Sequence, residues 1–234
     1  MERLDKIIAT QTEYSRKEVK ELVNKKRVIV NGEIVCKSDI KIDNNAEIKI
    51  YGFVINVKKN VYLILNKPQG YISATEDKSQ ATVLELIPEE YSHRNIFPVG
   101  RLDKDTTGLM VLSDDGEFAH NVLSPKKHVK KIYEVTLDIP VTKEMQIAFK
   151  DGIKLIDGIC KAADLEITGE YTCVVTLVEG RYHQIKRMFG CFGGKVIKLN
   201  RIGMGNLLLP KDLKLGECRE LREEELDKIK ERVK

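Results

Sequence analysis

The sequence predicts an α+β protein with two domains, a small N-terminal domain over residues 1–58 and a larger domain over residues 59–234. Helical patterns and a hairpin signal fill the first quarter of the chain, and apolar strand patterns resume directly after the charged stretch at 58–60. Charge divides the chain at the same place. The first 59 residues hold 13 Lys and Arg against 9 Asp and Glu, which accounts for the whole net charge of +4.

Length and composition exclude several classes of protein. With 234 residues, of which 42% are hydrophobic, the chain can bury one sizeable core and still form a small accessory domain. The charged start at 1–6 lacks the apolar core of a signal peptide, and no apolar run is long enough to span a bilayer. We therefore expect a cytoplasmic protein without a membrane partner. The five cysteines form no Cys-x-x-Cys pair, so we expect neither disulfides nor zinc.

Local patterns define the elements of the small domain. Apolar residues at helical spacing predict a helix over residues 3–10, and Ser15–Glu18 is a capping box that opens a second helix. Asn31-Gly32 lies between two apolar triplets, which is the strongest short-range hairpin signal in the chain. Alternating residues over 47–57 predict a further strand pair. A small basic domain joined to a neutral one indicates a protein that holds a polyanion at one end.

Strand and helix patterns follow one another in the larger domain. The first strand, Val61–Leu65, ends at the turn Asn66–Tyr71, where Pro68 blocks continuation. The strand over 132–139 alternates with period two, which places Tyr133 on its apolar face. The other expected strands are 109–112 and 172–178, and the other expected helices are 82–87, 117–123, 142–150 and the charged terminal stretch Arg219–Lys234.

The densest group of polar residues lies in Gly100–Gly108, directly before the buried strand at 109–112. So many carboxylates and hydroxyls between strands predict a loop, and Asp103 is the candidate reactive group on it. A solvated turn is one alternative interpretation. A calcium loop is another, but it would need a bidentate Glu at its end and helices at its flanks. A phosphatase of the haloacid dehalogenase type would need a long strand where Gly100 and Arg101 stand.

A second dense stretch, Glu179–Phe189, follows the strand at 172–178. Its apolar residues fall on one helical face, so Lys186 and Arg187 project elsewhere. The helix dipole disfavours a cation near the start of a helix, so the position of Lys186 indicates a specific anionic partner. His183 has no evident partner, and a lone histidine is more often structural than catalytic.

Four motifs in this chain resemble those of bacterial ribosomal RNA pseudouridine synthases. They are Asn-Lys-Pro-x-Gly at 66–70, Gly-Arg-Leu-Asp-x-Asp-Thr-x-Gly-Leu at 100–109, Lys-x-Tyr at 131–133 and Glu-Gly-x-x-His-Gln-Ile-Lys-Arg-Met at 179–188. The resemblance implies a catalytic domain built on a mixed, mostly antiparallel sheet with flanking helices. It implies that Asp103 is the nucleophile, that Lys186 is its salt-bridge partner and that Tyr133 stacks on the target base. Arg101 is the candidate wedge that flips this base out of its stack.

The small domain resembles the alpha-L RNA-binding domain of small-subunit ribosomal protein four. The shared features are the Arg-Leu-Asp start, the Ser-Arg opening of the second helix and the Val-x-Val-Asn-Gly hairpin. This resemblance implies that the basic residues of the domain bind RNA. The expected RNA contacts are Arg3, Ser15, Arg16, Lys17, Lys20, Lys25, Lys26 and Arg27 in the small domain, and Arg181, His183 and Arg187 in the larger one.

The resemblance implies an isomerase that converts one uridine of ribosomal RNA to pseudouridine, and the motifs are most similar to those of enzymes that modify uridine 516 of 16S rRNA. Enzymes that act on 23S rRNA share most of the motifs and are an alternative. A non-catalytic RNA-binding protein of ribosome assembly is an alternative of a different class. The expected partner is ribosomal RNA in a small-subunit assembly intermediate, and the expected state is a monomer.

The chemistry of this isomerisation makes few demands on the protein. The reaction has no net redox change and adds no outside group, so we expect no cofactor and no metal. An ionised Asp103 in a site that excludes water requires a cation within salt-bridge reach, and Lys186 would supply it. Asp105 is expected to be a loop residue that forms hydrogen bonds with the backbone.

Overall fold

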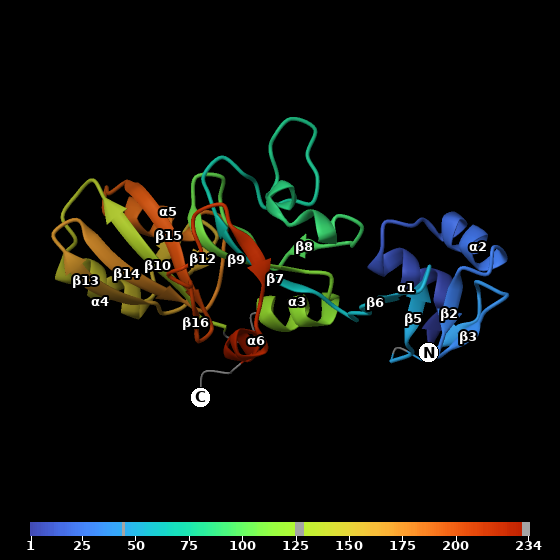
Figure 1. Ribbon diagram of the computed structural model, residues 1–234. Coiled ribbons are helices and arrows are strands. Elements are labelled where there is room, and N and C mark those ends of the chain that lie inside the picture. The colour runs from blue at the N-terminus through green and yellow to red at the C-terminus, as the bar shows by residue number, and fades with distance from the viewer. Residues whose placement is uncertain (44, 125–128, 231–234) are drawn as a thin grey trace. The chain divides into compact units, whose positions relative to one another are not determined.

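The computed structural model describes residues 1–43, 45–124 and 129–230 (Figure 1). The chain forms two compact units. The first comprises Met1–Val61 together with Pro88–Asn95, and the second comprises Tyr62–Ile87 together with Ile96–Lys234. Residues 88–95, which lie inside the larger predicted domain, therefore pack with the first unit. The domain boundary between residues 58 and 59 stays a prediction.

The first unit joins two short helices to small antiparallel sheets. Ser15 caps α2 through a capping box with Glu18, as predicted. Asn31 and Gly32 have φ values of 50° and 86°, so the expected tight hairpin turn joins β2 and β3. The apolar faces of the helices and strands form one core, which includes Leu4, Ile8 and Val19. The elements are β1 Glu2–Arg3, α1 Leu4–Gln11, α2 Arg16–Asn24, β2 Val28–Val30, β3 Glu33–Ile34, β4 Lys41–Ile42, β5 Ile48–Ile50 and β6 Phe53–Ile55.

A nine-stranded sheet, counted over the described residues, forms the frame of the second unit. Its main path runs β13, β14, β10, β15, β9, β7 and β17, while β8 pairs with β9 and β16 pairs with β15. Among the described strands only β15 and β9 pair in parallel, which confirms the mixed, mostly antiparallel sheet. The strands are β7 Tyr62–Lys67, β8 Phe97–Pro98, β9 Thr107–Ser113, β10 Lys131–Leu137, β13 Asp164–Gly169, β14 Thr172–Leu177, β15 Val196–Met204, β16 Leu207–Leu208 and β17 Cys218–Glu220, and β11 Lys154–Leu155 forms a separate hairpin with β12 Gly158–Ile159.

Four central strands place one row of residues across this sheet. Gly108 of β9 pairs with Lys67 of β7 on one side and with Arg201 of β15 on the other, and Arg201 pairs in turn with Tyr133 of β10. Gly108 has a φ of +103°, and a Cβ atom there would lie 2.3 Å from the carbonyl oxygen of Arg201. Only glycine therefore allows β9 and β15 to approach this closely. The row places Tyr133, Arg201, Gly108 and Lys67 in this order on the four consecutive strands β10, β15, β9 and β7.

Helices bury apolar side chains against both ends of the sheet. Phe118 and Val122 of α3 and Ile229 of α6 share a core with strand residues of β7 and β9. At the other end, the rings of Phe149 in α4 and Phe189 in α5 lie with their centroids 4.8 Å apart. The helices are α3 Gly116–Leu123, α4 Lys143–Asp151, α5 Gln184–Gly190 and α6 Glu223–Lys230, with short 3₁₀ helices at Val83–Leu86 and Glu89–Tyr91. No helix in the described part of the chain is long and apolar enough to cross a membrane.

The prediction that the terminal helix begins at Arg219 is wrong. Residues 218–220 form strand β17, which pairs with β7 through Cys218–Leu65, Arg219–Ile64 and Glu220–Leu63. This pairing satisfies the backbone groups of β7 that β9 does not reach, and it outweighs the helical pattern of the sequence. The helix α6 therefore begins at Glu223, and the predicted part beyond residue 230 lies outside the described residues.

Candidate active site

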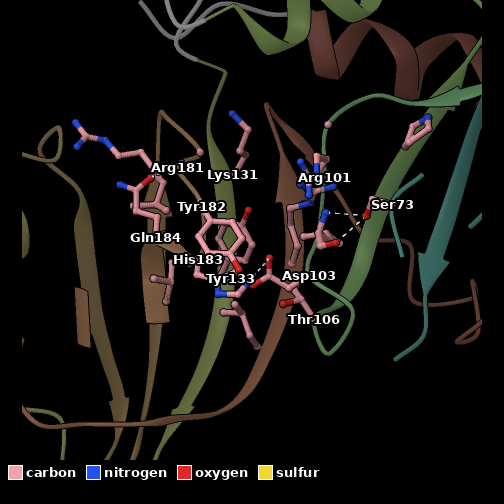
Figure 2. A pocket seen from close by; sticks show the side chains of 18 of the residues that line it. Ser73, Arg101, Asp103, Thr106, Lys131, Tyr133, Arg181, Tyr182, His183 and Gln184 are labelled. Carbon is pink, nitrogen blue, oxygen red and sulfur yellow. Dashed lines mark hydrogen bonds and ion pairs between the residues drawn. The ribbon is translucent and has the colours of Figure 1, made fainter. Parts of the chain in front are cut away.

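Asp103 lies in the loop between β8 and β9, at the edge of a cavity of about 670 Å³. Tyr133, His183 and Lys186 line the same cavity. In Figure 2 the carboxylate of Asp103 points from its loop toward His183 and Tyr133. Three segments far apart in the sequence therefore meet here: the loop before β9, strand β10, and the start of α5. All the cavity residues belong to the second unit.

The amino group of Lys186 joins two carboxylates. Its Nζ atom lies 3.1 Å from Oδ2 of Asp103, and 2.6 and 2.8 Å from Oδ1 and Oδ2 of Asp105. Burial lowers the pKa of Lys186, but the hydrogen bonds to both carboxylates raise it by more, so the net pKa lies above its usual value. Lys186 is therefore a stable cation at neutral pH. The structure brings Lys186 and Asp103 together, and their catalytic roles stay predictions.

The interpretation of Asp105 as a loop residue that bonds to local backbone is incomplete. Its carboxylate accepts two hydrogen bonds from Lys186. Burial raises the pKa of Asp105, but the hydrogen bond and charge of Lys186 lower it by more, and the net pKa lies below its usual value. This contact depends on tertiary structure, because α5 places Lys186 next to both carboxylates. Within the described ranges, no three His, Cys, Asp or Glu side chains form a group that could hold a metal ion.

His183 is a neighbour of the predicted nucleophile that the sequence did not reveal. Its Nε2 atom lies 3.5 Å from Oδ1 of Asp103. The residue precedes α5 with a φ of 47°, and its ring stacks on that of Tyr182 with centroids 3.8 Å apart. A left-handed conformation is uncommon for residues other than glycine and often marks a functional site. His183, which was expected to contact RNA, therefore also lies next to Asp103.

The segment that follows β7 holds the loop of Asp103 in place. The Nζ atom of Lys67 donates to the carbonyl oxygens of Asp103 and Thr106 at 3.2 and 2.9 Å, and also to those of residues 68 and 104. Ser73 adds a hydrogen bond from its hydroxyl to the carbonyl oxygen of Leu102 at 2.7 Å. The Asn-Lys-Pro-x-Gly motif is therefore physically coupled to the Asp103 motif. Burial lowers the pKa of Lys67, whose side chain is fully buried, to about 8.

We expect Lys67→Met to destabilise the protein by about 3 kcal/mol, because several buried carbonyl groups lose their donor. The isomerisation rate should fall as well, because the backbone on both sides of Asp103 is no longer held. Urea unfolding measures the first effect. Lys104→Met is the matched control, since Lys104 is an exposed residue of the same loop that bonds to Gln80, and its loss should cost under about 0.5 kcal/mol. Equal stability of the two variants would contradict this role for Lys67.

Tyr133 and Arg101 line the cavity from different parts of the chain. Tyr133 stands on β10, is 8% exposed and lines the cavity, which leaves part of its ring accessible to a ligand. Arg101 is exposed on the loop two residues before Asp103 and also lines the cavity. Both positions suit the predicted roles in stacking and base flipping. Those roles stay predictions.

Two further cations line the cavity, and neither was expected as a site residue, although Lys131 belongs to the Lys-x-Tyr motif. Arg201 on β15 is 1% exposed, and its Nε atom donates to the carbonyl oxygen of Leu109 at 2.6 Å. Lys131 on β10 is partly buried, and its Nζ atom donates to the carbonyl oxygen of Val129 at 3.3 Å. Burial, followed by the nearby charge of Arg201, lowers the pKa of Lys131 to about 8.

Arg181 and Arg187, both expected to contact RNA, are engaged with the protein. The guanidinium of Arg181 donates to three carbonyl oxygens of residues 157–159. Arg187 Nη2 bonds to both carboxylate oxygens of Asp157, at 2.8 and 3.0 Å. These contacts fix the hairpin of β11 and β12 beside α5. RNA binding by the two arginines stays a prediction.

The predicted RNA-binding residues of the first unit fall into two groups. Arg3 and Arg16 both bond to the buried carboxylate of Asp5, at 2.8 and 3.0 Å. The hydrogen bond from Arg3, together with that from Arg16, lowers the pKa of Asp5 to about 2 although burial opposes the shift. Ser15 serves as the cap of α2. Lys17, Lys20, Lys25, Lys26 and Arg27 are exposed, and Arg27 also lies 5.8 Å from the ring centroid of Tyr51.

Comparisons with known proteins agree with this geometry. Residues 61–190 match the family described as RNA pseudouridylate synthase, and residues 2–48 match the S4 domain. An uncharacterized RNA pseudouridine synthase of Bacillus subtilis is 41% identical over 98% of this chain and 98% of its own length. A ribosomal small subunit pseudouridine synthase A of Yersinia pestis is 38% identical over 97% of both chains.

A solved structure extends the similarity to three dimensions. The crystal structure of a pseudouridylate synthase matches with a TM-score of 0.70 and 37% identity, over 98% of this chain and all of that one. The similarity therefore covers both the N-terminal domain and the domain that carries Asp103. On these grounds the chain belongs to the RNA pseudouridylate synthase family, a family of isomerases, and carries an N-terminal S4 domain.

Proposed function

We propose that the protein isomerises one uridine of ribosomal RNA to pseudouridine, and that this uridine is position 516 of 16S rRNA. The observation that carries the proposal is the meeting of Asp103, Lys186 and Tyr133 at one cavity, in a chain that belongs to the pseudouridylate synthase family. The names of full-length relatives, such as the small-subunit enzyme of Yersinia pestis, support ribosomal RNA as the substrate. We further propose that the enzyme acts in the cytoplasm as a monomer, on a small-subunit assembly intermediate.

The site suits a reaction that moves a base without an outside group. Asp103 attacks or deprotonates the sugar of the target nucleotide, for which its carboxylate must be ionised. Lys186 stabilises that ionised form, because its positive charge lies 3.1 Å from the carboxylate of Asp103 in a partly buried site. Tyr133 stacks on the extruded uracil, which offsets the cost of unstacking, typically a few kcal/mol.

Turnover on defined RNA tests the proposal. The purified protein is incubated with unmodified 16S rRNA, with 23S rRNA and with the corresponding subunit assembly intermediates, and pseudouridine is mapped at nucleotide resolution. Pseudouridine at position 516 of 16S rRNA is the expected result. A product in 23S rRNA alone would reassign the substrate, and RNA binding without any product would favour the non-catalytic alternative.

The exposed lysines of α2 provide a separate test of RNA binding by the first unit. Changing Lys17 and Lys20 together to Gln should weaken RNA binding and reduce the slope of log K against log salt by about two contacts. Arg3 and Arg16 are less suitable, because their loss would also break the bonds to Asp5. Lys211→Gln, an exposed lysine of the second unit, is the control. A salt slope equal to that of the control would assign these lysines to a solvated surface.

A further inference from the structure

Arg201 is a buried cation whose hydrogen bonds are incomplete. Its side chain is 1% exposed and lines the cavity that holds Asp103. One nitrogen, Nε, donates to the carbonyl oxygen of Leu109, but Nη2 has no hydrogen-bond partner among the described residues. A buried charged donor without an acceptor is costly, so such a group in a cavity indicates a ligand that completes it.

The side chains that line the cavity carry more positive than negative charge. Among the described lining residues there are five cations, Arg101, Lys131, Arg181, Lys186 and Arg201, against the single carboxylate of Asp103. That carboxylate pairs with Lys186, and Arg181 is bonded to backbone carbonyls and to Glu179. Lys131 is close enough to Arg201 that their charges repel. Lys131 on β10 and Arg201 on β15 thus form a positive floor of the cavity. The charge of Glu179, which does not line the cavity, acts on Lys131.

The position of this floor favours the base of the target nucleotide over its phosphates. Arg201 pairs with Tyr133 in the register of β15 and β10, so the two side chains are next to one another in the row across the sheet. A base stacked on Tyr133 would therefore lie next to the side chain of Arg201. A phosphate carries a full charge, so its desolvation in a buried site costs more than that of a neutral carbonyl oxygen, and an exposed cation such as Arg101 binds it without that cost.

We propose that Arg201, assisted by Lys131, binds the carbonyl oxygens of the target uracil and stabilises the negative charge that the ring takes up when its glycosidic bond breaks. The inference rests on the proposed function. It assigns to Arg201 a catalytic role, because the guanidinium touches the base that leaves and rejoins the sugar. Preorganised donors aimed at developing charge are typically worth about 100-fold or more in rate.

The electrons of the step balance without an outside reagent. The bond between C1′ and N1 breaks, and its electron pair stays on the uracil, spread over N1, O2 and O4. The sugar is completed either by a bond from Asp103 to C1′ or by loss of the C2′ proton to that carboxylate. The rotated uracil anion then joins C1′ through C5, and the Asp103 bond breaks or the C2′ proton returns. The C5 proton passes to solvent and N1 takes up a proton from solvent, so the product is a neutral isomer of uridine. Both routes create the same anion, so the role of Arg201 does not depend on the choice between them.

The test compares uridine with 5-fluorouridine at the target position of the same RNA. Fluorine withdraws electrons and makes the uracil anion more stable, so cleavage of the fluorinated base depends less on a cation. Arg201→Met should lower the single-turnover rate of glycosidic cleavage by about 100-fold for uridine and by less than about tenfold for 5-fluorouridine, with RNA affinity within about threefold. Arg201→Lys should recover part of the loss, because it restores the charge. Lys131→Met, at a partly exposed position, should show the same but smaller difference between the substrates.

Arg101→Met is the matched control, since it removes another cation of the same cavity. It should slow both substrates by the same factor. Equal factors for Arg201→Met, or a loss confined to affinity and salt slope, would overturn the proposal and assign Arg201 to phosphate. If Arg201→Met does not fold, Arg201→Lys and Lys131→Met test the proposal instead, through the ratio of their rate losses for uridine and 5-fluorouridine.

A binding measurement separates failure of this inference from failure of the proposed function. If the wild-type protein forms no pseudouridine in any ribosomal RNA, the proposed function fails. Binding of the free bases then tests the role of Arg201. The wild type should then bind free 5-fluorouracil more tightly than uracil at pH 8, and Arg201→Met should lose that preference. A preference of equal size in both proteins would overturn the role of Arg201.

Discussion

Asp103→Asn is expected to abolish isomerisation, with a loss of more than about 1,000-fold in the single-turnover rate. The amide has nearly the same shape as the carboxylate, so the loop held by Lys67 and Ser73 should stay folded. It carries no charge, however, and it can act neither as a nucleophile nor as a base. RNA affinity should remain within a few-fold of the wild type. Retention of even about a tenth of the rate would remove Asp103 from this role.

Asp105→Asn is the informative control, because Asp105 shares Lys186 with Asp103 and stands two residues away. Its carboxylate is more exposed than that of Asp103, with 66% against 27% of the side chain accessible. Loss of its charge leaves Lys186 paired with Asp103 alone, so we expect a decrease of at most about tenfold. Measuring both variants under identical single-turnover conditions shows whether the chemistry depends on one particular carboxylate. Equal losses for the two would assign the reaction to the pair.

The elements that the sequence predicted are those fixed by neighbouring residues. The capping box of Ser15 and the turn at Asn31-Gly32 depend on side chains and φ values within a few positions, and both are present as expected. The alternation around Tyr133 is likewise local, and it places this ring on the buried face of β10. Strand β17 is different, because it exists only through pairing with β7 from a distant part of the chain. Nothing in the residues of β17 itself indicates that partner.

The same distinction applies to the site. Motifs identified Asp103, Tyr133 and Lys186, which the structure places at one cavity. The contact between His183 and Asp103 depends on a left-handed turn before α5, which a lone histidine does not announce. Arg201 is buried because β15 runs between β9 and β10, so its importance follows from sheet order and not from any neighbouring residue.

Lys186→Met is expected to slow isomerisation by about 100-fold near neutral pH while RNA affinity changes by less than about threefold. The reason is that Lys186 lies within 3.1 Å of Asp103 and closer still to Asp105, so its loss leaves the partly buried carboxylate of Asp103 and the exposed one of Asp105 without their cation. A lysine that bound phosphate would behave differently. Its loss would weaken RNA binding and reduce the salt slope by about one contact, with little effect on the rate at saturating RNA.

The pH profile of Lys186→Met provides the sharper distinction. Lys186 lowers the pKa of Asp105 despite the opposing effect of burial, so removal of Lys186 should raise that pKa. A carboxylate with a depressed pKa is charged above that pKa, and it loses its charge when the pH falls through that pKa. The part of the acid limb that follows Asp105, which contributes at most about tenfold to the rate, should therefore move to higher pH in Lys186→Met, and Lys186→Arg should largely restore it. The pKa of Lys186 itself is raised above its usual 10.5, so its deprotonation should not limit the wild-type rate at neutral pH. An acid limb that stays in place, together with a loss confined to RNA affinity, would assign Lys186 to the RNA backbone.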